Sequence, residues 1–136
     1  MSDDTVGADV RQAILDLCAA YNWLTDTGDA HGVAALFTPD GVWDGPPGRY
    51  EGTAAIVDFN ERIHEVIRGS MHFNGNHQFE PDGDRIRHRC SSALHLVSDD
   101  GVQIQLMTYE DIIVPLDGEW RFAERVNRNF DPAAFT

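Results

Sequence analysis

The chain has 136 residues, 42% of them hydrophobic and 24% charged, which predicts one globular domain over 1–136 and excludes a disordered or fibrous protein. Its formal net charge of −13 would repel phosphate backbones and anionic lipid surfaces, so we expect neither a nucleic acid nor a membrane as a partner. All basic residues are arginine, which excludes Schiff-base and phosphate-loop lysines.

The first predicted element is an amphipathic helix, because apolar residues recur at helical spacing from Val10 to Leu24. Gly28 suits the C-terminal cap of this helix, and Asp29 suits the N-cap of a second, shorter one. The shorter helix is expected to turn three apolar side chains inward, namely Val33, Leu36 and Phe37.

A turn, a short strand and a loop are predicted next, over 39–41, 42–44 and 45–48. Thr53 is then expected to cap a third helix that runs to about Arg68, because apolar residues again recur at helical spacing.

After Gly69 the apolar pattern changes to period two, which predicts strands at about 71–79, 85–97, 102–114 and 119–130. The turns between them each contain a glycine, as hairpins require. Helices followed by consecutive hairpins predict an α+β domain with an antiparallel sheet. The terminal segments 1–8 and 131–136 are expected to be loosely ordered.

Cysteine usage and the N-terminus give two further expectations. Cys18 and Cys90 lie far apart without metal-ligand spacing, so we expect reduced thiols and neither a metal nor a cofactor. The acidic N-terminus lacks the basic and apolar regions of a signal peptide, and no apolar run is long enough for a membrane span. A cytoplasmic protein is therefore expected.

Several motifs in this order resemble the nuclear transport factor 2-like superfamily, and within it the SnoaL-like group. They are Tyr21 followed by Asp26, LFTPDGVWDG at 36–45, YEG at 50–52, His72 followed by Asn76, and DGEWRFAER at 117–125. In pattern the chain is most similar to hexachlorocyclohexane dehydrochlorinase and bile-acid 7α-dehydratase, and less so to scytalone dehydratase.

The resemblance implies a cone-shaped α+β fold, in which three N-terminal helices pack on a curved, mostly antiparallel sheet and enclose an apolar pocket. In those enzymes an aspartate at the end of the first helix orients a histidine that takes a proton from the substrate, and Asp26 and His72 match these positions. The resemblance thus implies a cofactor-independent dehydratase or dehydrohalogenase acting on a small to medium hydrophobic ring.

Strand alternation leaves the choice of histidine open. Strict alternation puts His72 and His77 on opposite faces. The resemblance favours His72 and the apolar content of the face favours His77, and a β-bulge at Asn74–Gly75 would reconcile them. Because a regular strand points the two apart, we do not expect both on one metal.

Further polar residues are candidates for the same site. The hydroxyl of Tyr21 is expected to enter the pocket or to reach a backbone acceptor. Asp26 lies off the apolar face and needs a bend at 25–28 to aim inward. Arg125 is a candidate for stabilising an anionic leaving group. Strand alternation puts its side chain on a solvated face, so Arg128 is the competing candidate for this role. Three histidines are expected at the surface or on a helix face: His31, His64 and His88. The remaining candidates for binding the substrate are Trp23, Trp43, Tyr50, Phe59, Asn76, His95 and Leu106.

Two other functions remain open. The first is a ketosteroid-isomerase-like isomerase or polyketide cyclase, although the expected base position falls on Gly45, with Asp44 one place early. The second is a non-catalytic module that binds a hydrophobic ligand or another subunit. The two-sided apolar strand at 102–114 predicts a homodimer, with a trimer as the alternative.

Overall fold

A computed structural model describes residues 5–135. Residues 1–4 and 136, which belong to the terminal segments predicted to be loosely ordered, lie outside this range. Within it, Val6 is buried and Pro132–Phe135 forms a short 3-10 helix.

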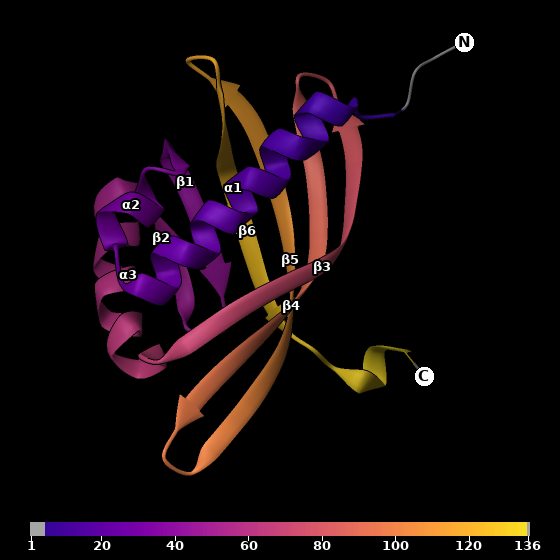
Figure 1. The fold of residues 1–136 in the computed structure, drawn as a ribbon. Coiled ribbons are helices and arrows are strands. Elements are labelled where there is room, and N and C mark those ends of the chain that lie inside the picture. Colours follow the sequence, from indigo (N-terminus) through magenta and orange to yellow (C-terminus); the bar gives the residue numbers. More distant parts are fainter. Residues whose placement is uncertain (1–4, 136) are drawn as a thin grey trace.

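The α+β class is confirmed, with the elements close to their predicted places. The helices are α1 (Ala8–Thr27), α2 (Ala30–Ala34) and α3 (Thr53–Ile67), and the strands are β1 (Phe37–Gly45), β2 (Gly48–Glu51), β3 (Ser70–Asp82), β4 (Arg85–Ser98), β5 (Gly101–Leu116) and β6 (Glu119–Asn129). In Figure 1, α1 lies across one face of the sheet, while α2 and α3 lie at its β1–β2 end.

The sheet is mostly antiparallel, as predicted. Its strand order is β2-β1-β6-β5-β4-β3. The exception is β1, which pairs with β6 in parallel. The hairpin of β4 and β5 projects beyond the body of the molecule at the lower end of Figure 1.

Helix ends follow the predicted chemistry in α1 and α2 but not in α3. Gly28 caps α1 with a φ of 82°, and the side chain of Asp29 accepts a hydrogen bond from the backbone N–H of Gly32 at 2.8 Å. The prediction that Thr53 is an N-cap is wrong. Gly52 takes that position, and Thr53 is the first helical residue.

The prediction for 39–48 differs from the structure in two respects: the predicted turn at 39–41 is part of a strand, and the strand β2, which begins at Gly48, was not predicted. Residues 39–41 lie inside β1, where a register shift between Phe37 and Val42 accommodates them. Such irregularities tolerate a proline, which has no N–H for the ladder. β2 was not predicted, because four residues with alternating burial give only a weak pattern.

β3 carries one extra residue relative to β4. Gly75 pairs with Ser91 and Gln78 pairs with Arg89, so Asn76 and His77 together stand opposite Cys90. This is a β-bulge, and Asn76 takes a left-handed φ of 56° there. Alternation therefore reverses along β3, and the side chains of His72 and His77 both turn toward the inner, helix-covered face of the sheet.

A second bulge lies in β6. Ile112 pairs with Glu124 while Ile113 pairs with Phe122, so Ala123 is the extra residue. The side chains of Phe122 and Arg125, three positions apart, consequently both point inward and are fully buried.

The core lies between α1, α2, α3 and the inner face of the sheet, and its buried residues form one hydrophobic cluster. The outer face of β3, β4 and β5 is different. There, six large apolar side chains are 47% to 59% exposed. We call these the outer patch: Met71, Phe73, Val97, Val102, Ile104 and Leu106.

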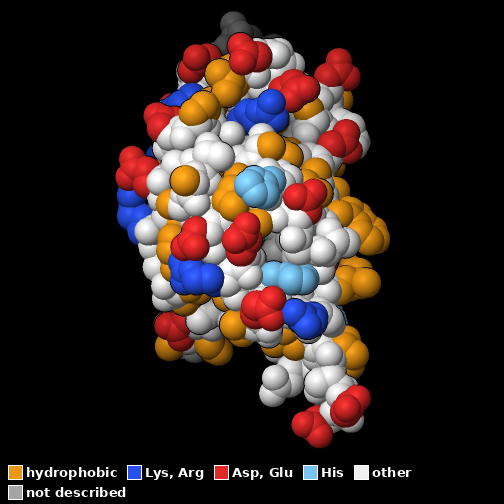
Figure 2. Space-filling model, turned by 90° about the vertical axis from the view of Figure 1, so that its left-hand side faces the viewer, with side chains coloured by type: hydrophobic (Ala, Val, Ile, Leu, Met, Phe, Trp, Pro, Cys, Tyr) orange, Lys and Arg blue, Asp and Glu red, His pale blue; other side chains and the backbone are white. Residues whose placement is uncertain are grey.

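Acidic side chains are more frequent than basic ones on one face of the molecule (Figure 2). On the face shown in Figure 2 they are spread widely among few basic groups, in keeping with the net charge of −13. Among residues 5–135, none of the helices has the length and apolar character needed to cross a membrane.

Candidate functional site

Asp26 and His72 meet where the end of α1 crosses the start of β3. Oδ1 of Asp26 lies 2.5 Å from Nδ1 of His72, and Oδ2 accepts the backbone N–H of the same residue at 3.0 Å. The side chains are 13% and 5% exposed. An ionised carboxylate only accepts hydrogen bonds, so Nδ1 carries the proton and Nε2 keeps its lone pair.

No bend is needed to bring Asp26 to this position, contrary to the prediction. α1 continues as a regular helix to Thr27, and β3 passes close enough to its last turn for the carboxylate to reach the strand. Asp26 therefore reaches His72 from the edge of the buried face of α1, without a change in the direction of the helix.

His72 lines a cavity of about 140 Å³ between the helices and the sheet. We call it the small cavity, and its walls are mainly apolar and aromatic. Tyr21, Trp43 and Phe59 are among the residues that line it, and Trp43 Nε1 donates a hydrogen bond to the Tyr21 hydroxyl at 2.9 Å. Burial raises the pKa of Tyr21, although Arg125 opposes this effect. The phenol therefore stays protonated and can donate a hydrogen bond.

Five predicted substrate-binding residues do not line the small cavity. Trp23 is 67% exposed, because it lies off the α1 stripe that buries Tyr21 and Thr25. His95 and Leu106 point to the outer face by alternation, because their strand neighbours Leu94 and Met107 line the cavity.

Asn76 and Tyr50 are the other two. Asn76 is the exposed residue of the β3 bulge, and its Nδ2 donates to Ser91 Oγ at 3.4 Å. Tyr50 stacks on Phe59 with the ring centroids 4.4 Å apart. It therefore supports a wall of the cavity without forming it.

Arg125 is fully buried, which overturns the solvated face that alternation predicts for it. The bulge at Ala123 is the physical reason, and the rival Arg128 is exposed. The Arg125 guanidinium carbon lies 4.2, 3.8 and 4.6 Å from the ring centroids of Tyr21, Tyr109 and Phe122, distances typical of cation–π contacts.

Arg125 is not among the residues that line the small cavity. Its Nε lies 3.3 Å from Asp111 Oδ1. Burial alone would lower the pKa of Arg125, but Asp111 holds it above the usual value, so the guanidinium stays charged. Arg125 thus reaches the cavity only through the rings of Tyr21 and Tyr109, which line it.

A chain of polar contacts leads from Asp111 back to β3. Asp111 Oδ2 lies 2.8 Å from His88 Nδ1, and His88 Nε2 lies 2.9 Å from His77 Nδ1. His88 is 2% exposed, so its prediction as a surface residue is wrong. Its neighbours on β4 follow strict alternation, which turns His88 and Cys90 to the inner face.

His77 and His88 line a second, larger cavity of about 770 Å³, which we call the large groove. Burial is the main cause that lowers the pKa of His77, and the nearby His88 and Arg125 lower it further. The His77 ring is therefore neutral near pH 7. Four arginines line the same groove: Arg11, Arg87, Arg89 and Arg128.

Six polar residues of the small cavity were not predicted from the sequence, namely Thr25, Asn60, Gln105, Tyr109, Asn127 and Asn129. The hydroxyl of Thr25 is buried and has no hydrogen-bond partner among the described residues. Helical spacing carried a usable signal for two of them, because Thr25 is four residues after Tyr21 and Asn60 four after Ile56.

The comparisons with known proteins agree with this fold. The model of the SnoaL-like domain matches residues 8–126, and the chain belongs to this family. A search of curated proteins finds no match.

Among solved structures, one similar chain is Rv3472 of Mycobacterium tuberculosis, a protein of unknown function solved as an aspartate-to-asparagine variant. It is 29% identical, with a TM-score of 0.84 over 94% of this chain and 79% of that one. A protein of Novosphingobium aromaticivorans with the provisional name scytalone dehydratase is 24% identical, with a TM-score of 0.80 over 90% and 85%. ActVI-ORFA of Streptomyces coelicolor is 21% identical, with a TM-score of 0.79 over 88% and 97%.

Proposed function

We propose that this protein is a cofactor-independent lyase that removes water or hydrogen halide from a small hydrophobic ring. The observation that carries the proposal is the double contact of Asp26 with His72 beside the small cavity. A base held in one tautomer at the wall of an apolar cavity is suited to proton abstraction from carbon.

In the proposed reaction, Nε2 of His72 takes a proton from the ring carbon next to the carbon that bears the leaving group. The electrons of the broken C–H bond form the C=C bond, and the leaving group departs with its own bonding pair. Asp26 stabilises the imidazolium that forms and keeps the ring in position.

Tyr21 supports departure of the leaving group. The Tyr21 hydroxyl accepts from Trp43 and is also hydrogen-bonded to Tyr109. In the proposed reaction it turns its own hydrogen to the leaving group. Departing hydroxide needs such a donor, and departing chloride needs it less. Arg125 lies against the Tyr21 ring, and we assign it a positioning role.

The size of the cavity narrows the substrate class. A volume of about 140 Å³ resembles cavities that hold one benzene-sized molecule, and it is below the roughly 300–1,000 Å³ of drug-sized pockets. The substrate is therefore a single substituted ring. Four fused rings of a steroid would not fit.

The isomerase alternative receives less support from the same geometry. Asp44, the nearest carboxylate to the expected base position, is not among the residues that line the small cavity.

The test is turnover of a panel of single-ring compounds by the wild type and His72→Ala. The panel contains chlorinated cyclohexanes and cyclic β-hydroxy ketones, with steroids as the size control. Chloride release and ultraviolet absorbance of the new C=C bond are measured. The exposed His31 on α2 gives the matched control His31→Ala.

We expect conversion by the wild type and His31→Ala but not by His72→Ala. Binding without conversion by all three proteins would instead support the non-catalytic module. Conversion by His72→Ala at the wild-type rate would remove His72 as the base.

We also propose that the outer patch is the contact surface of a homodimer. Its side chains lie in adjacent rows, because Phe73, Ala93 and Leu106 pair across three strands, as do Met71, His95 and Ile104. A contiguous apolar face of this kind is typical of a protein interface. A second copy fits because symmetric dimers pair the same patch with itself.

A further inference from the structure

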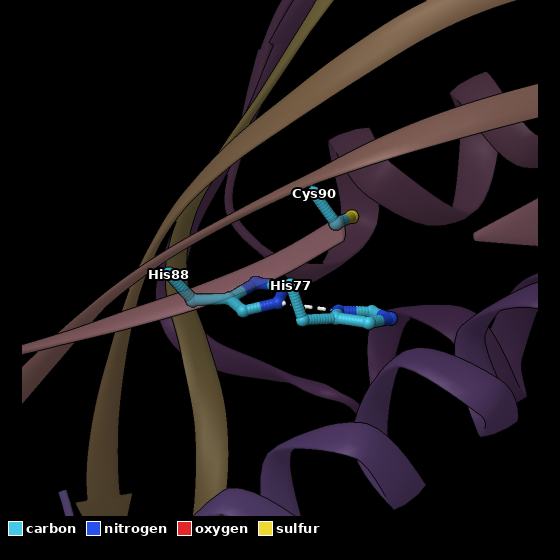
Figure 3. A group of neighbouring side chains, drawn as sticks. All are labelled: His77, His88 and Cys90. Atoms are coloured by element: carbon cyan, nitrogen blue, oxygen red, sulfur yellow. Dashed lines mark hydrogen bonds between the residues drawn. The ribbon is translucent and has the colours of Figure 1, made fainter. Parts of the chain in front are cut away.

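Three metal-ligating side chains from two neighbouring strands meet on the inner face of the sheet, away from the small cavity. They are His77 of β3 and His88 and Cys90 of β4, and one ligand atom of each lies within 4.8 Å of the others. Figure 3 shows the two imidazole rings in contact and the sulfur of Cys90 beside them. We infer that this group binds a divalent transition-metal ion of the zinc class.

The backbone brings the three together. The bulge in β3 places His77 opposite Cys90, and alternation along β4 puts His88 on the same face as Cys90. Without the extra residue, Asn76 would occupy the inner position and His77 would point outward. The cross-strand pairing also explains why the sequence shows no metal motif, since the ligands come from two strands.

The distances suit a small metal ion after a modest shift. Tetrahedral zinc with Zn–N of about 2.0–2.1 Å and Zn–S of about 2.3 Å separates two nitrogens by roughly 3.4 Å and a nitrogen from sulfur by roughly 3.6 Å. His77 Nδ1 and His88 Nε2 are 2.9 Å apart. The rings must move apart by a few tenths of an ångström, and the sulfur must approach by up to about 1.2 Å, from at most 4.8 Å to roughly 3.6 Å.

His88 already has the support that a metal ligand needs. Its Nδ1 donates to Asp111 Oδ2 at 2.8 Å, which leaves the lone pair of Nε2 for the metal. Arg125 holds the other oxygen of Asp111 at 3.3 Å. At Cys90 the Arg125 charge outweighs that of Asp111, and this positive charge favours the thiolate that the metal requires.

The chemistry of the ligands selects the ion. Two imidazoles and a thiolate favour zinc, cobalt or copper over magnesium or calcium, which prefer oxygen. On binding, Cys90 releases its proton to solvent, and His77 takes the tautomer with its proton on Nε2. Both histidines line the large groove, which gives the ion a path of entry and a place for a fourth ligand such as water.

The test is a titration of the full chain, stripped with a chelator, with Co²⁺ as the spectroscopic probe. We expect absorption to saturate at one equivalent, with visible bands of tetrahedral cobalt and a sulfur-to-cobalt charge-transfer band in the near ultraviolet. Zn²⁺ should displace cobalt and abolish both. The variants are Cys90→Ser, His77→Ala, and the controls Cys18→Ser and His31→Ala.

Cys90→Ser should lose the charge-transfer band, and His77→Ala should weaken cobalt binding about tenfold or more. The two controls should bind cobalt as the wild type does. Circular dichroism checks that each variant is folded, and His77, which is only half-buried, is the replacement least able to disturb the core.

Three outcomes would overturn the inference. They are the absence of any saturable cobalt spectrum in the wild type, a charge-transfer band that survives in Cys90→Ser, and a band that is lost in Cys18→Ser instead. None of these measurements depends on the substrate of the small cavity, so they separate the metal site from the proposed lyase activity.

Discussion

Asp26 uses both of its carboxylate oxygens on the same residue, His72, although 46 residues separate them in sequence. One oxygen binds the ring and the other the backbone N–H. The ring and the start of β3 are thereby fixed relative to the end of α1. A contact of this kind makes the carboxylate both an orienting group for the imidazole and a tie between two elements.

Replacement of Asp26 by asparagine should therefore damage catalysis more than folding. The asparagine oxygen can still accept the backbone N–H, but its amide nitrogen then faces Nδ1 as a donor and favours the tautomer with the proton on Nε2. We expect kcat for the proposed elimination to fall by about 10²–10⁴-fold and KM to change little. Steady-state kinetics with a substrate found in the panel measures this.

Asp29→Asn is the matched control, because asparagine is as good an N-cap as aspartate. Its kcat should stay at the wild-type value. An equal loss of kcat in both variants would contradict a specific role for Asp26 in orienting His72.

Tyr21→Phe should separate the two classes of leaving group. The variant keeps the ring that packs on Arg125 and loses the hydroxyl that receives the Trp43 hydrogen bond. Elimination of water should slow by about 10²-fold, and elimination of chloride by less than about tenfold. The comparison uses one ring with either leaving group. An equal loss for both would exclude Tyr21 as the donor.

The two long helices and the four long strands were predictable because each carries several periods of apolar spacing, as from Val10 to Leu24 in α1. The site was harder. His72 came from the resemblance to a family. Arg125 was placed wrongly and His77 was left open, because one extra residue in a strand reverses every later side chain and no local sequence pattern marks it. His88 was placed wrongly for another reason, since strict alternation along β4 puts it on the inner face. His95 and Leu106 were errors of a different kind, since alternation from buried neighbours would have put them outside.

Loss of the buried guanidinium should cost much stability. Arg125→Met keeps an unbranched apolar side chain beside the three rings but removes the guanidinium, which leaves the Asp111 carboxylate without its cation in a fully buried place. The free energy of unfolding should fall by about 3–5 kcal/mol. Urea denaturation measures it.

The double variant Arg125→Met/Asp111→Asn provides the control, because it removes both charges. It should be more stable than Arg125→Met alone. A double variant that is less stable than the single one would argue against an uncompensated carboxylate as the cause.

Alkaline pH should weaken the fold through its two thiols. Burial raises the pKa of Cys18 from 9.0 to about 12 and that of Cys90 to about 11. Above pH 9 the unfolded chain loses these protons and the folded chain keeps them, so the unfolded state binds fewer protons and stability falls as pH rises. The expected slope is about 1.4 kcal/mol per pH unit for each thiol.

Urea denaturation between pH 8 and 10.5 measures this slope. Cys18→Ala lowers stability at every pH. It should also make the fall of stability with pH less steep, because only one of the two thiols then contributes to it. A slope that is the same in wild type and variant would assign the alkaline loss to other groups, such as Tyr21 and Tyr109, whose pKa values burial also raises.

A charge in the outer patch should dissociate the proposed dimer. Ile104 is 58% exposed at the centre of the patch, and Ile104→Glu would place two carboxylates in the shared face. Sedimentation velocity should show a dimer for the wild type and a monomer for the variant. Val66→Glu is the control, because Val66 is 74% exposed on α3, outside the patch. A wild type that sediments as a monomer at micromolar concentration would contradict the dimer.

The extra residue in β3 makes this strand serve two chambers at once. Its first half delivers His72 to the small cavity, and its second half delivers His77 to the large groove. Deletion of Asn76 would turn the second half over while leaving the first half in place. A single insertion or deletion at this point would therefore add His77 to the large groove or remove it, without moving His72. The two halves of β3 can thus change independently.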